Sequence, residues 1–320
     1  MIGENEKQQV KRTECGLPSS DGRSELHVMM WKPHGKVRAV LQISHGMIEH
    51  IGRYDEFART MAAQGIAVVG HDHLGHGKTS RREDYGFFAE KSGDVYMVRD
   101  IHRVRRAAGR IYPNLPYIFL GHSMGSFFLR KYLTVYGDEA DGAILMGTGD
   151  EPLFILLAGR AAVGVVGRWK GWRYRSYFLH NLVLGDFDRK FKPVGCPSDW
   201  LTSDEKKVRE YQEDPMCSFH FTCQAYKDFF KTMLDLKSSF WLKRIPKDLP
   251  VLILSGREDP VGARGRGVRR VYRKLCRLGL TDVNIRLYPE CRHELLNERN
   301  REHVYHDISM WINERIGNKK

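Results

Sequence analysis

Short, almost fully apolar runs alternate with longer amphipathic segments in the first half of the chain. Five runs have the length and composition of β-strands: residues 26–31, 37–44, 66–70, 116–120 and 143–146. The segments between them predict helices at residues 54–64, at 94–111, and from the turn at 121–125 to about residue 136. Apolar strands separated by helices are typical of a parallel sheet covered on both faces.

This pattern stops after residue 149 and resumes at residue 243. The intervening residues 150–242 are rich in aromatic side chains and form a segment much longer than an ordinary loop. Beyond it, we predict strands at 251–254 and 283–287, and helices at 264–278 and 301–316. We therefore expect an α/β fold with a mostly parallel central sheet. Residues 1–149 and 243–320 would form its core, and residues 150–242 an inserted helical cap.

The sequence Gly-His-Ser-Met-Gly at residues 121–125 lies between a predicted strand and a predicted helix. This is the context of the nucleophile-elbow motif G-x-S-x-G, in which a strained turn exposes the serine at its tip. Glycines are needed there because side chains at the flanking positions would clash. The motif makes Ser123 a candidate nucleophile.

A serine hydroxyl needs a base to accept its proton and an acid to orient that base. With this motif, the acid and then the base follow the ends of later strands. Asp259 lies five residues after the first predicted strand beyond the insertion, and His293 lies six residues after the next one. Asp150 and Glu258 are the alternatives to Asp259 as the acid. We predict a triad of Ser123, His293 and Asp259.

The oxyanion formed during acyl transfer requires preorganised N–H donors. One donor is expected to be the backbone N–H of Met124, at the start of a helix whose dipole assists. The other should come from the loop after strand 37–44, which begins His45-Gly46-Met47, with the N–H of Met47 as the donor. The alternative is that His45 and Gly46 form only a turn.

Two other patterns resemble sites of different classes but lack required residues. Residues 77–79 (Gly-Lys-Thr) are similar to the end of a phosphate-binding loop, but the position of the required earlier glycine is Asp72. Residues 71–76 resemble a histidine cluster of metallohydrolases, but Gly75 stands where a carboxylate would be needed. We expect no metal and no cofactor.

The formal net charge is +13, which attracts polyanions such as anionic membranes or is simply a solvated basic surface. No nucleic-acid-binding module is recognisable, so we expect no nucleic-acid partner. The six cysteines are scattered without a CxxC pair, which argues against a disulfide framework. The N-terminal residues are polar, and the most apolar run, 152–167, is too short to span a bilayer. We expect a cytoplasmic protein.

Four motifs in this order resemble the monoacylglycerol lipase and lysophospholipase-like branch of the α/β hydrolases, which is also catalogued with serine aminopeptidases. They are HGMIEH at 45–50, DHLGHG at 72–77, GHSMG at 121–125 and RHE at 292–294. The resemblance covers about residues 25–315. Within the insertion, DWLT at 199–202 and DPMC at 214–217 are similar to cap segments of bacterial members.

This resemblance implies an α/β-hydrolase fold and hydrolysis of an ester, typically a monoacylglycerol or a lysophospholipid, under a mobile cap. It implies the same triad and the same oxyanion donors. It also implies that five further residues support the triad or contact the polar end of the substrate: His45, Gly46, Glu49, His50 and His122. Thr79 replaces a serine that the family often has, and it keeps the hydroxyl group.

Residues 152–180 are apolar and aromatic, with five basic residues and no acidic residue. Such a surface would suit contact with an anionic membrane or the covering of an acyl chain, or it would simply pack on the core. A free-amine substrate calls for carboxylates, which this segment lacks. We therefore predict a lipid-ester hydrolase with a small-molecule substrate. A small-ester carboxylesterase, a serine aminopeptidase and a non-catalytic binding protein on the same scaffold are the alternatives.

Overall fold

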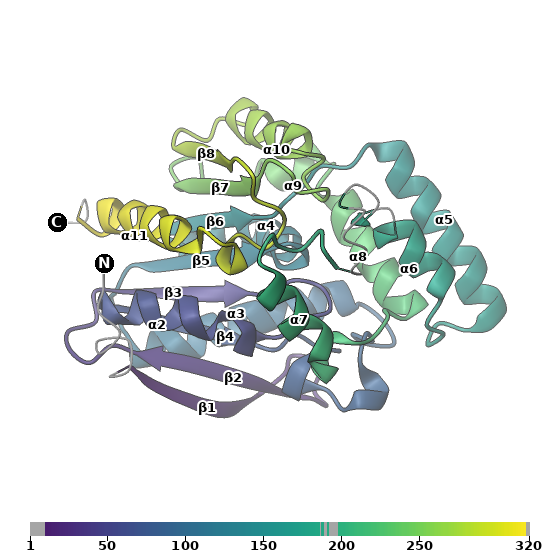
Figure 1. The fold of residues 1–320 in the computed structure, drawn as a ribbon, viewed down its shortest axis with the longest axis horizontal. Helices are drawn as coiled ribbons and strands as arrows, with labels where there is room; N and C mark the ends of the chain where they lie inside the picture. Colours follow the sequence, from purple (N-terminus) through teal and green to yellow (C-terminus); the bar gives the residue numbers. More distant parts are fainter. Residues whose placement is uncertain (1–9, 186, 189–190, 192–197, 318–320) are drawn as a thin grey trace.

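The computed structural model describes residues 10–185, 187–188, 191 and 198–317 (Figure 1). Its eight strands are β1 (Lys11–Pro18), β2 (Glu25–Lys32), β3 (Ala39–Ser44), β4 (Ile66–His71), β5 (Tyr117–His122), β6 (Gly142–Met146), β7 (Val251–Gly256) and β8 (Val283–Tyr288). They form one sheet in the order β1-β2-β4-β3-β5-β6-β7-β8. All neighbours from β4 to β8 are parallel, whereas β1 pairs antiparallel with β2 and β2 antiparallel with β4. The predicted α/β class with a mostly parallel sheet is confirmed.

Seven of these strands lie within two residues of the predicted apolar runs. The exception is β1, which the sequence pattern did not reveal. Its side chains are all exposed or half-buried, so it has no apolar run, and it forms the outer edge of the sheet beside β2. The pairing of its backbone with β2, from Lys11 opposite Lys32 to Pro18 opposite Glu25, explains how so polar a segment forms a strand.

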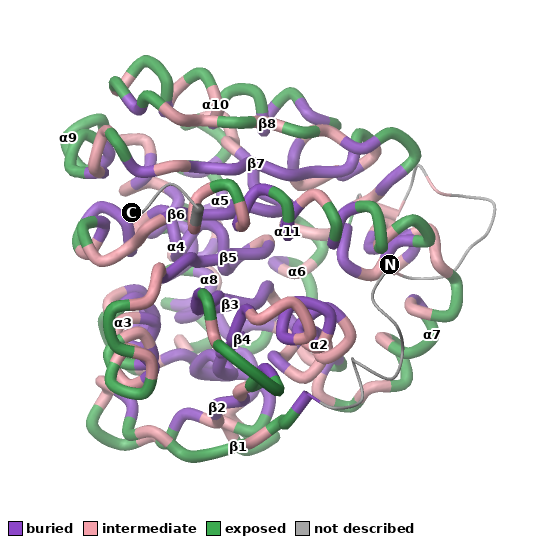
Figure 2. Tube along the Cα trace, turned by 90° about the vertical axis from the view of Figure 1, so that its left-hand side faces the viewer, coloured by how far each residue is buried: buried purple, intermediate pink, exposed green. Residues whose placement is uncertain are grey.

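Helices cover both faces of the sheet (Figures 1 and 2). Outside the insertion they are α2 (Asp55–Ala63), α3 (Gly93–Ile111), α4 (Met124–Tyr136), α10 (Arg266–Arg277) and α11 (Arg301–Gly317), each ending within two residues of its predicted bounds. Phe57 of α2 packs on Tyr305 of α11 on one face of the sheet. The buried side chains of α3, α4 and α10 belong to the core on the other face.

In its described part, the chain between β6 and β7 forms helices and adds no strand to the sheet. These helices are α5 (Leu153–Lys170), α6 (Tyr177–Leu184), α7 (Glu205–Glu213), α8 (Cys223–Asp235) and α9 (Ser239–Leu242). Gly159 of α5 lies against the ring of Phe230 of α8, so these two helices pack closely together. We keep residues 150–242 as the proposed extent of the cap.

None of the helices in the described ranges combines the length and the apolar character needed to cross a bilayer.

Single-turn 3-10 helices occur in the connections. They are η1 (Ile51–Tyr54), η2 (Gly77–Thr79), η3 (Arg82–Asp84), η4 (Gly137–Glu139), η6 (Pro215–Cys217) and η7 (Leu295–Asn297). Two of them, η1 and η7, lie in loops that follow strands β3 and β8. In a parallel sheet such loops gather at one edge, which is where ligands bind in this class of fold.

Four fully buried histidines gather where β3 and β4 end: His45, His71, His73 and His76. The rings of His45 and His73 are 4.3 Å apart, and those of His71 and His73 are 4.7 Å apart. Among the described residues, neither ring nitrogen of His71 has a hydrogen-bond partner, and Nε2 of His76 has none. Burial lowers the pKa of His71 and that of His76 to about 3, so both rings are neutral at neutral pH.

We expect these histidines to make the protein sensitive to mild acid. In the unfolded chain each would titrate near pH 6.5, so below that pH the unfolded state binds more protons than the folded state. The free energy of unfolding should therefore fall by about 2 kcal/mol for each of His71 and His76 between pH 7 and pH 5. Urea denaturation across this pH range measures the decrease.

The variant His71→Leu should show a smaller decrease because it removes one of the titrating groups without removing a hydrogen bond. The exposed His34 supplies the matched control, since His34→Leu should keep the pH dependence of the wild type. An unchanged pH dependence in His71→Leu would contradict the assignment.

Candidate active site

Strand β5 passes into helix α4 through one residue, Ser123, which has φ 50° and ψ −122°. This conformation is unfavourable for a residue with a side chain, and it persists only where surrounding contacts enforce it. The N–H of Ser123 donates to the carbonyl oxygen of Met146 at 2.9 Å. Its own carbonyl oxygen accepts from the N–H of Ser126 at 2.8 Å and from the Ser126 hydroxyl at 2.6 Å. These contacts hold the strained turn predicted from the motif.

Two glycines allow the backbone to approach closely around this turn. A Cβ atom on Gly125 would collide with the carbonyl oxygens of Ser44 and His45 at the end of β3. A Cβ atom on Gly46 would lie 2.6 Å from Oε1 of Glu49 and 3.0 Å from Cβ of Ser123. The first turn of α4 can therefore rest directly on the loop after β3 only because both positions lack side chains.

Asp259 and His293 meet where β7 and β8 end. Nδ1 of His293 is 3.0 Å from Oδ1 of Asp259, and both residues are buried. The same carboxylate accepts from the N–H of Val261 at 2.9 Å and from the hydroxyl of Ser255 at 3.1 Å. Burial alone would raise the pKa of Asp259, but the neighbouring His293 and these hydrogen bonds outweigh it and lower the pKa. Asp259 is therefore charged beside the imidazole.

The two alternative acids lie elsewhere. Asp150 forms an ion pair with Lys237 at 2.6 Å, and Arg270 donates to its carbonyl oxygen. The carboxylate of Glu258 is 4.0 Å from the guanidinium of Arg292. The structure records no contact of either carboxylate with His293 among the described residues.

Ser123, His293, Met47 and Met124 line one pocket of about 770 Å³. Most of its wall is apolar and comes from α4, α5, α6 and α8, including Phe127, Phe154, Ile155, Ala162, Phe178, Leu182, Phe229, Phe230 and Met233. A larger open cleft of about 1090 Å³ beside β1 and β2 is lined largely by charged residues and contains neither Ser123 nor His293. The apolar pocket is therefore the candidate active site.

Beneath this pocket lies a buried ionic network centred on Glu49. Its Oε1 is 2.9 Å from Nδ1 of His122 and accepts from the hydroxyl of Tyr54 at 2.9 Å and from the N–H of Gly46. Arg53 is 3.2 Å from Oε2 of Glu49 and donates twice to the carboxylate of Glu294, at 2.6 and 2.7 Å. The network therefore joins the loop after β3, the end of β5 and the loop after β8.

Mutual attraction keeps this network charged despite its burial. Burial would raise the pKa of Glu49 and of Glu294, but His122 and Arg53 outweigh it, and both pKa values are lowered. Burial likewise opposes the charged form of His122, but the hydrogen bond to Glu49 raises the pKa of that ring. The ring of His122 lies 4.8 Å from that of His293. A cationic imidazole is thus favoured next to His293, which lines the same pocket as Ser123.

The structure separates the five residues expected near the site into two groups. Gly46, Glu49 and His122 surround Ser123, whereas His45 is buried below, accepting from the N–H of His73 at 2.9 Å. His50 does not line the pocket in the described part of the chain, and its Nε2 is 2.8 Å from Asp214. The expectation that His50 contacts the polar end of a substrate has no support in this geometry.

His50, Asp214 and Cys217 form the one group of side chains in the described ranges close enough together for a metal ion. Nδ1 of His50 accepts from the N–H of Gly52 at 3.2 Å, so the proton of the neutral ring lies on Nε2, which donates to Asp214. Burial raises the pKa of the Cys217 thiol, which disfavours the thiolate a metal needs. These features favour hydrogen bonding over metal coordination.

A segment between α6 and α7, residues 198–204, is hydrogen-bonded along the loop that carries His293. The N–H of Glu294 donates to the carbonyl oxygen of Leu201 at 2.6 Å, and the N–H of His293 donates to that of Trp200 at 3.4 Å. Arg292 donates to the carbonyl oxygens of Asp199 and Thr202 at 2.6 and 3.1 Å. We call residues 198–204 the strut segment, because it supports this loop along its length.

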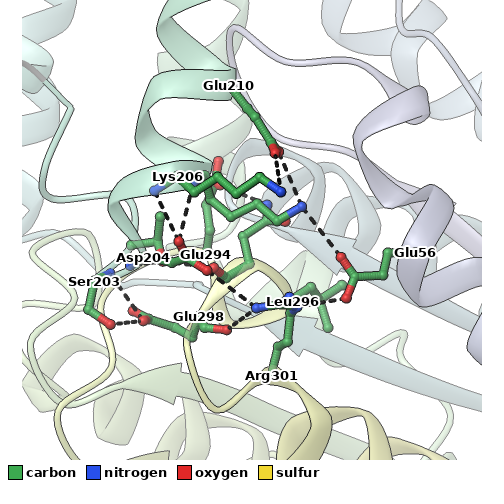
Figure 3. Close-up of polar contacts among 12 residues, drawn as sticks. Glu56, Ser203, Asp204, Lys206, Glu210, Glu294, Leu296, Glu298 and Arg301 are labelled. Atoms are coloured by element: carbon green, nitrogen blue, oxygen red, sulfur yellow. Dashed lines mark hydrogen bonds and ion pairs between the residues drawn. The ribbon is translucent and has the colours of Figure 1, made fainter.

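Further along, the side chain of Glu298 accepts from the N–H and hydroxyl of Ser203, and Arg301 bonds both Glu56 and Asp204 (Figure 3). At the other end of the strut segment, the ring of Trp200 lies 4.9 Å from that of His293. The ring of His293 therefore contacts the rings of both His122 and Trp200.

Sequence reasoning did not identify Arg53, Tyr54 or Trp200 as parts of the site. Arg53 and Tyr54 follow the expected HGMIEH motif within four residues, but nothing in a run of mixed polar residues indicates burial. Trp200 belongs to the DWLT motif, which was recognised only as a cap segment. Its contact with His293 depends on a chain reversal that apolar periodicity does not predict.

The family model described as serine aminopeptidase, S33, matches residues 35–300, and the chain belongs to this family. Human monoglyceride lipase is 29% identical over 303 residues, covering 93% of this chain and 90% of that protein. The monoacylglycerol lipase of Mycolicibacterium smegmatis is 27% identical over 293 residues, covering 88% of this chain and 91% of that protein.

Among solved structures, a thermostable carboxyl esterase from Bacillus coagulans in complex with glycerol superposes with a TM-score of 0.88 at 29% identity. The match covers 95% of this chain and 99% of that one. Together with the family match, these relatives make the chain a serine hydrolase of the lipase or esterase type, with the α/β-hydrolase fold. The expectation drawn from the four motifs is confirmed at this level.

The buried network generates a stability prediction. Glu49→Gln keeps the shape of the side chain but removes the negative charge that Arg53 and His122 face. The cationic ring of His122 would then lose its partner and Arg53 would keep only Glu294, so we expect the free energy of unfolding to fall by about 3–5 kcal/mol. Urea denaturation of the purified variant measures it.

The matched control is Glu213→Gln, a substitution of the same kind on an exposed side chain at the end of α7. It should change the free energy of unfolding by less than about 0.5 kcal/mol. Equal stability of the two variants would mean that Glu49 is not held as a buried anion.

Proposed function

We propose that this S33 family member hydrolyses lipid monoesters, releasing a fatty acid, with Ser123 as nucleophile, His293 as base and Asp259 as the acid that orients the base. The observation that carries this proposal is the arrangement at one pocket. A strained, accessible serine and an imidazole bonded to a buried carboxylate face the same apolar cavity. This is the set of groups that acyl transfer requires.

In the proposed first step, His293 accepts the hydroxyl proton of Ser123 while Ser123 attacks the ester carbonyl. The imidazolium is stabilised by Asp259, whose lowered pKa keeps it ionised. His293 then protonates the departing alcohol, leaving an acyl group on Ser123. Water repeats the sequence, with His293 again as base, and the fatty acid leaves.

Two backbone N–H groups are proposed to stabilise the oxyanion. Met124 is the first residue of α4, so its N–H has no acceptor within the helix, and it lies at the positive end of the helix dipole. The N–H of Met47 has no hydrogen-bond partner among the described residues. Both residues line the pocket beside Ser123, as an oxyanion hole requires.

The pocket wall supports an acyl chain as the larger part of the substrate. Its volume lies within the usual range of about 300–1,000 Å³ for small-molecule sites, and its side chains are mainly aromatic and aliphatic. The polar groups cluster at one end, around Ser123, Glu49 and His122. Relatives described as monoacylglycerol lipase and monoglyceride lipase support a glycerol monoester as the first substrate to test.

A serine aminopeptidase is the second candidate, favoured by the description of the family. Its substrate would need a carboxylate to bind the free amine. Glu49 and Glu294 at the pocket are both engaged by Arg53. Glu151 also lines the pocket, but burial raises its pKa and weakens it as a partner for a cation. These features support the ester over the amine substrate.

The cap is also proposed to contact a lipid surface. On α5 and α6, Phe154, Val165, Trp169 and Phe178 are between 62% and 79% exposed, although the opposite side of α5 packs on α8. Exposed apolar patches of this kind mark interaction sites, and the basic residues between them suit anionic headgroups. The sequence left open whether this segment packs on the core or exposes an apolar surface. Helix α5 does both, because one side packs on α8 and the other exposes apolar side chains.

The first experiment measures fatty-acid release from a 1-monoacylglycerol, a lysophospholipid and a short-chain nitrophenyl ester, together with hydrolysis of an aminoacyl nitroanilide. Wild type should cleave the monoacylglycerol or the lysophospholipid, and Ser123→Ala should lower every rate by at least about a thousandfold. The control Ser239→Ala removes an exposed serine hydroxyl outside the pocket and should have wild-type rates.

Hydrolysis of the short ester alone would reject the lipid substrate but keep the triad. Preferential hydrolysis of the aminoacyl nitroanilide would favour the aminopeptidase. Full activity of a folded Ser123→Ala variant would reject the nucleophile, and no activity of wild type toward any substrate would favour a binding protein on this scaffold.

Trp200 generates a second prediction, because its ring packs on that of His293. Trp200→Ala should lower kcat for the short-chain ester by about ten- to a hundredfold with little change in KM, since the base loses its orientation. Trp200→Phe should retain most of the activity. The control Trp169→Ala, on an exposed cap residue, should leave kcat unchanged. A raised KM at unchanged kcat would mean that Trp200 is only a wall of the pocket.

A further inference from the structure

The exposed side of α10 carries a stripe of arginine side chains, which we call the arginine face: Arg266, Arg269, Arg270, Arg273 and Arg277. At 3.6 residues per turn, these five positions fall within an arc of about 100°. The residues that bury the helix against the sheet, Val268, Val271 and Leu275, lie on the opposite side. The helix is therefore divided between an apolar side and a uniformly cationic side.

The positive charge of the arginine face is largely uncompensated. Between Pro260 and Thr281 the chain has six arginines, one lysine and no acidic residue. Arg270 donates to the carbonyl oxygen of Asp150 and lies 3.8 Å from its carboxylate. Arg269, Arg273 and Arg277 have no acidic partner within the described ranges. Three exposed guanidinium groups thus lack a counter-charge in the described part of the chain.

This arrangement does not help the helix to form. Residues three or four positions apart are neighbours on a helix surface, so the arginines repel each other. Arg266 stands in the first turn, where a positive charge opposes the helix dipole, whereas Arg277 stands in the last turn, where it is favourable. A surface of mutually repelling charges with few internal acidic partners suits an external polyanion, whose charge would relieve the repulsion.

The position of α10 indicates which polyanion fits. Val261 and Ala263, in the loop before α10, line the pocket of Ser123. Arg270 holds the backbone at Asp150, three residues before α5 begins with the exposed Leu153 and Phe154. Figure 1 shows α10 beside the connection from β6 into α5. One part of the arginine face, at Arg270, thus lies close to the exposed apolar start of α5.

We propose that the arginine face binds the anionic headgroups of a phospholipid bilayer while the start of α5 contacts its apolar layer. A bilayer presents negative charge directly above hydrocarbon, which matches the order of the two surfaces. Nucleic acid offers the charge but no apolar layer to receive Phe154. This proposal rests on the proposed function only in the choice of a lipid as the partner. The test measures binding without turnover, so the two proposals can fail separately.

The test is co-sedimentation with vesicles of ether-linked phospholipids, which an ester hydrolase cannot cleave. One set contains phosphatidylcholine alone and the other phosphatidylcholine with phosphatidylglycerol. Wild type should bind the anionic vesicles more strongly, and raised salt should release it because the charges are exposed. The triple variant Arg269→Gln, Arg273→Gln, Arg277→Gln should lower the partition coefficient by roughly tenfold to a hundredfold.

The matched control replaces three exposed arginines outside α10 with glutamine: Arg23, Arg81 and Arg299. It changes the net charge equally and should bind like wild type. Both triple variants should keep the wild-type melting temperature and the wild-type rate toward a soluble short-chain ester. If wild type hydrolysed no ester, the proposed function would be rejected, but the result of the binding test would still stand.

Three outcomes would overturn the proposal. Binding of the α10 triple variant equal to that of wild type would show that the arginine face is only solvated. An equal loss in both triple variants would show that net charge, and not this face, determines binding. Binding to a single-stranded oligonucleotide is measured for the same variants. If the α10 triple variant lost this binding but still bound vesicles like wild type, the partner would be a nucleic acid.

Discussion

The whole site depends on keeping one buried carboxylate ionised. Glu49 contacts the loop after β3 through the N–H of Gly46, the end of β5 through His122, and the loop after β8 through Arg53 and Glu294. Each of these segments carries a group proposed for acyl transfer. If Glu49 were neutral, His122 would lose its partner, Arg53 would keep only Glu294, and the three segments would lose their common contact. The negative charge of Glu49 is therefore required for the arrangement of these segments.

Much of this could be predicted from the sequence because the relevant signals are local. Apolar strands separated by amphipathic helices indicated seven of the eight strands, and the glycines at 121 and 125 marked the sharp turn at Ser123. Strand β1 was missed because its contacts are made by the backbone, so that its side chains carry no pattern. A local sequence pattern reveals a strand only through its buried side chains. An edge strand with two exposed faces has almost no buried side chains and therefore shows no such pattern.

The remaining parts of the site depend on contacts between distant segments. Arg53 and Glu294 are 241 residues apart in sequence, and their bidentate pair forms only once β3 and β8 lie in one sheet. Trp200 reaches His293 from the insertion, through a segment with little regular structure. Even the recognised motifs could not separate His50 from Glu49, since both belong to the same six residues. In the structure Glu49 contacts His122, whereas the adjacent His50 contacts Asp214.

The strut segment also determines which parts of the insertion can be exchanged. Residues 198–204 are bonded to the loop of His293 by main-chain and side-chain contacts, whereas α5 and α6 form pocket wall without touching that loop through any recorded hydrogen bond in the described chain. The insertion therefore has two parts with different roles: α5 and α6 form pocket wall, and the strut segment supports the loop of His293. A chimaera that takes α5 and α6 from a relative would replace only the part of the pocket wall that these two helices form. One that takes the entire insertion would also replace the support of the histidine, and it would need a compatible strut from the same donor.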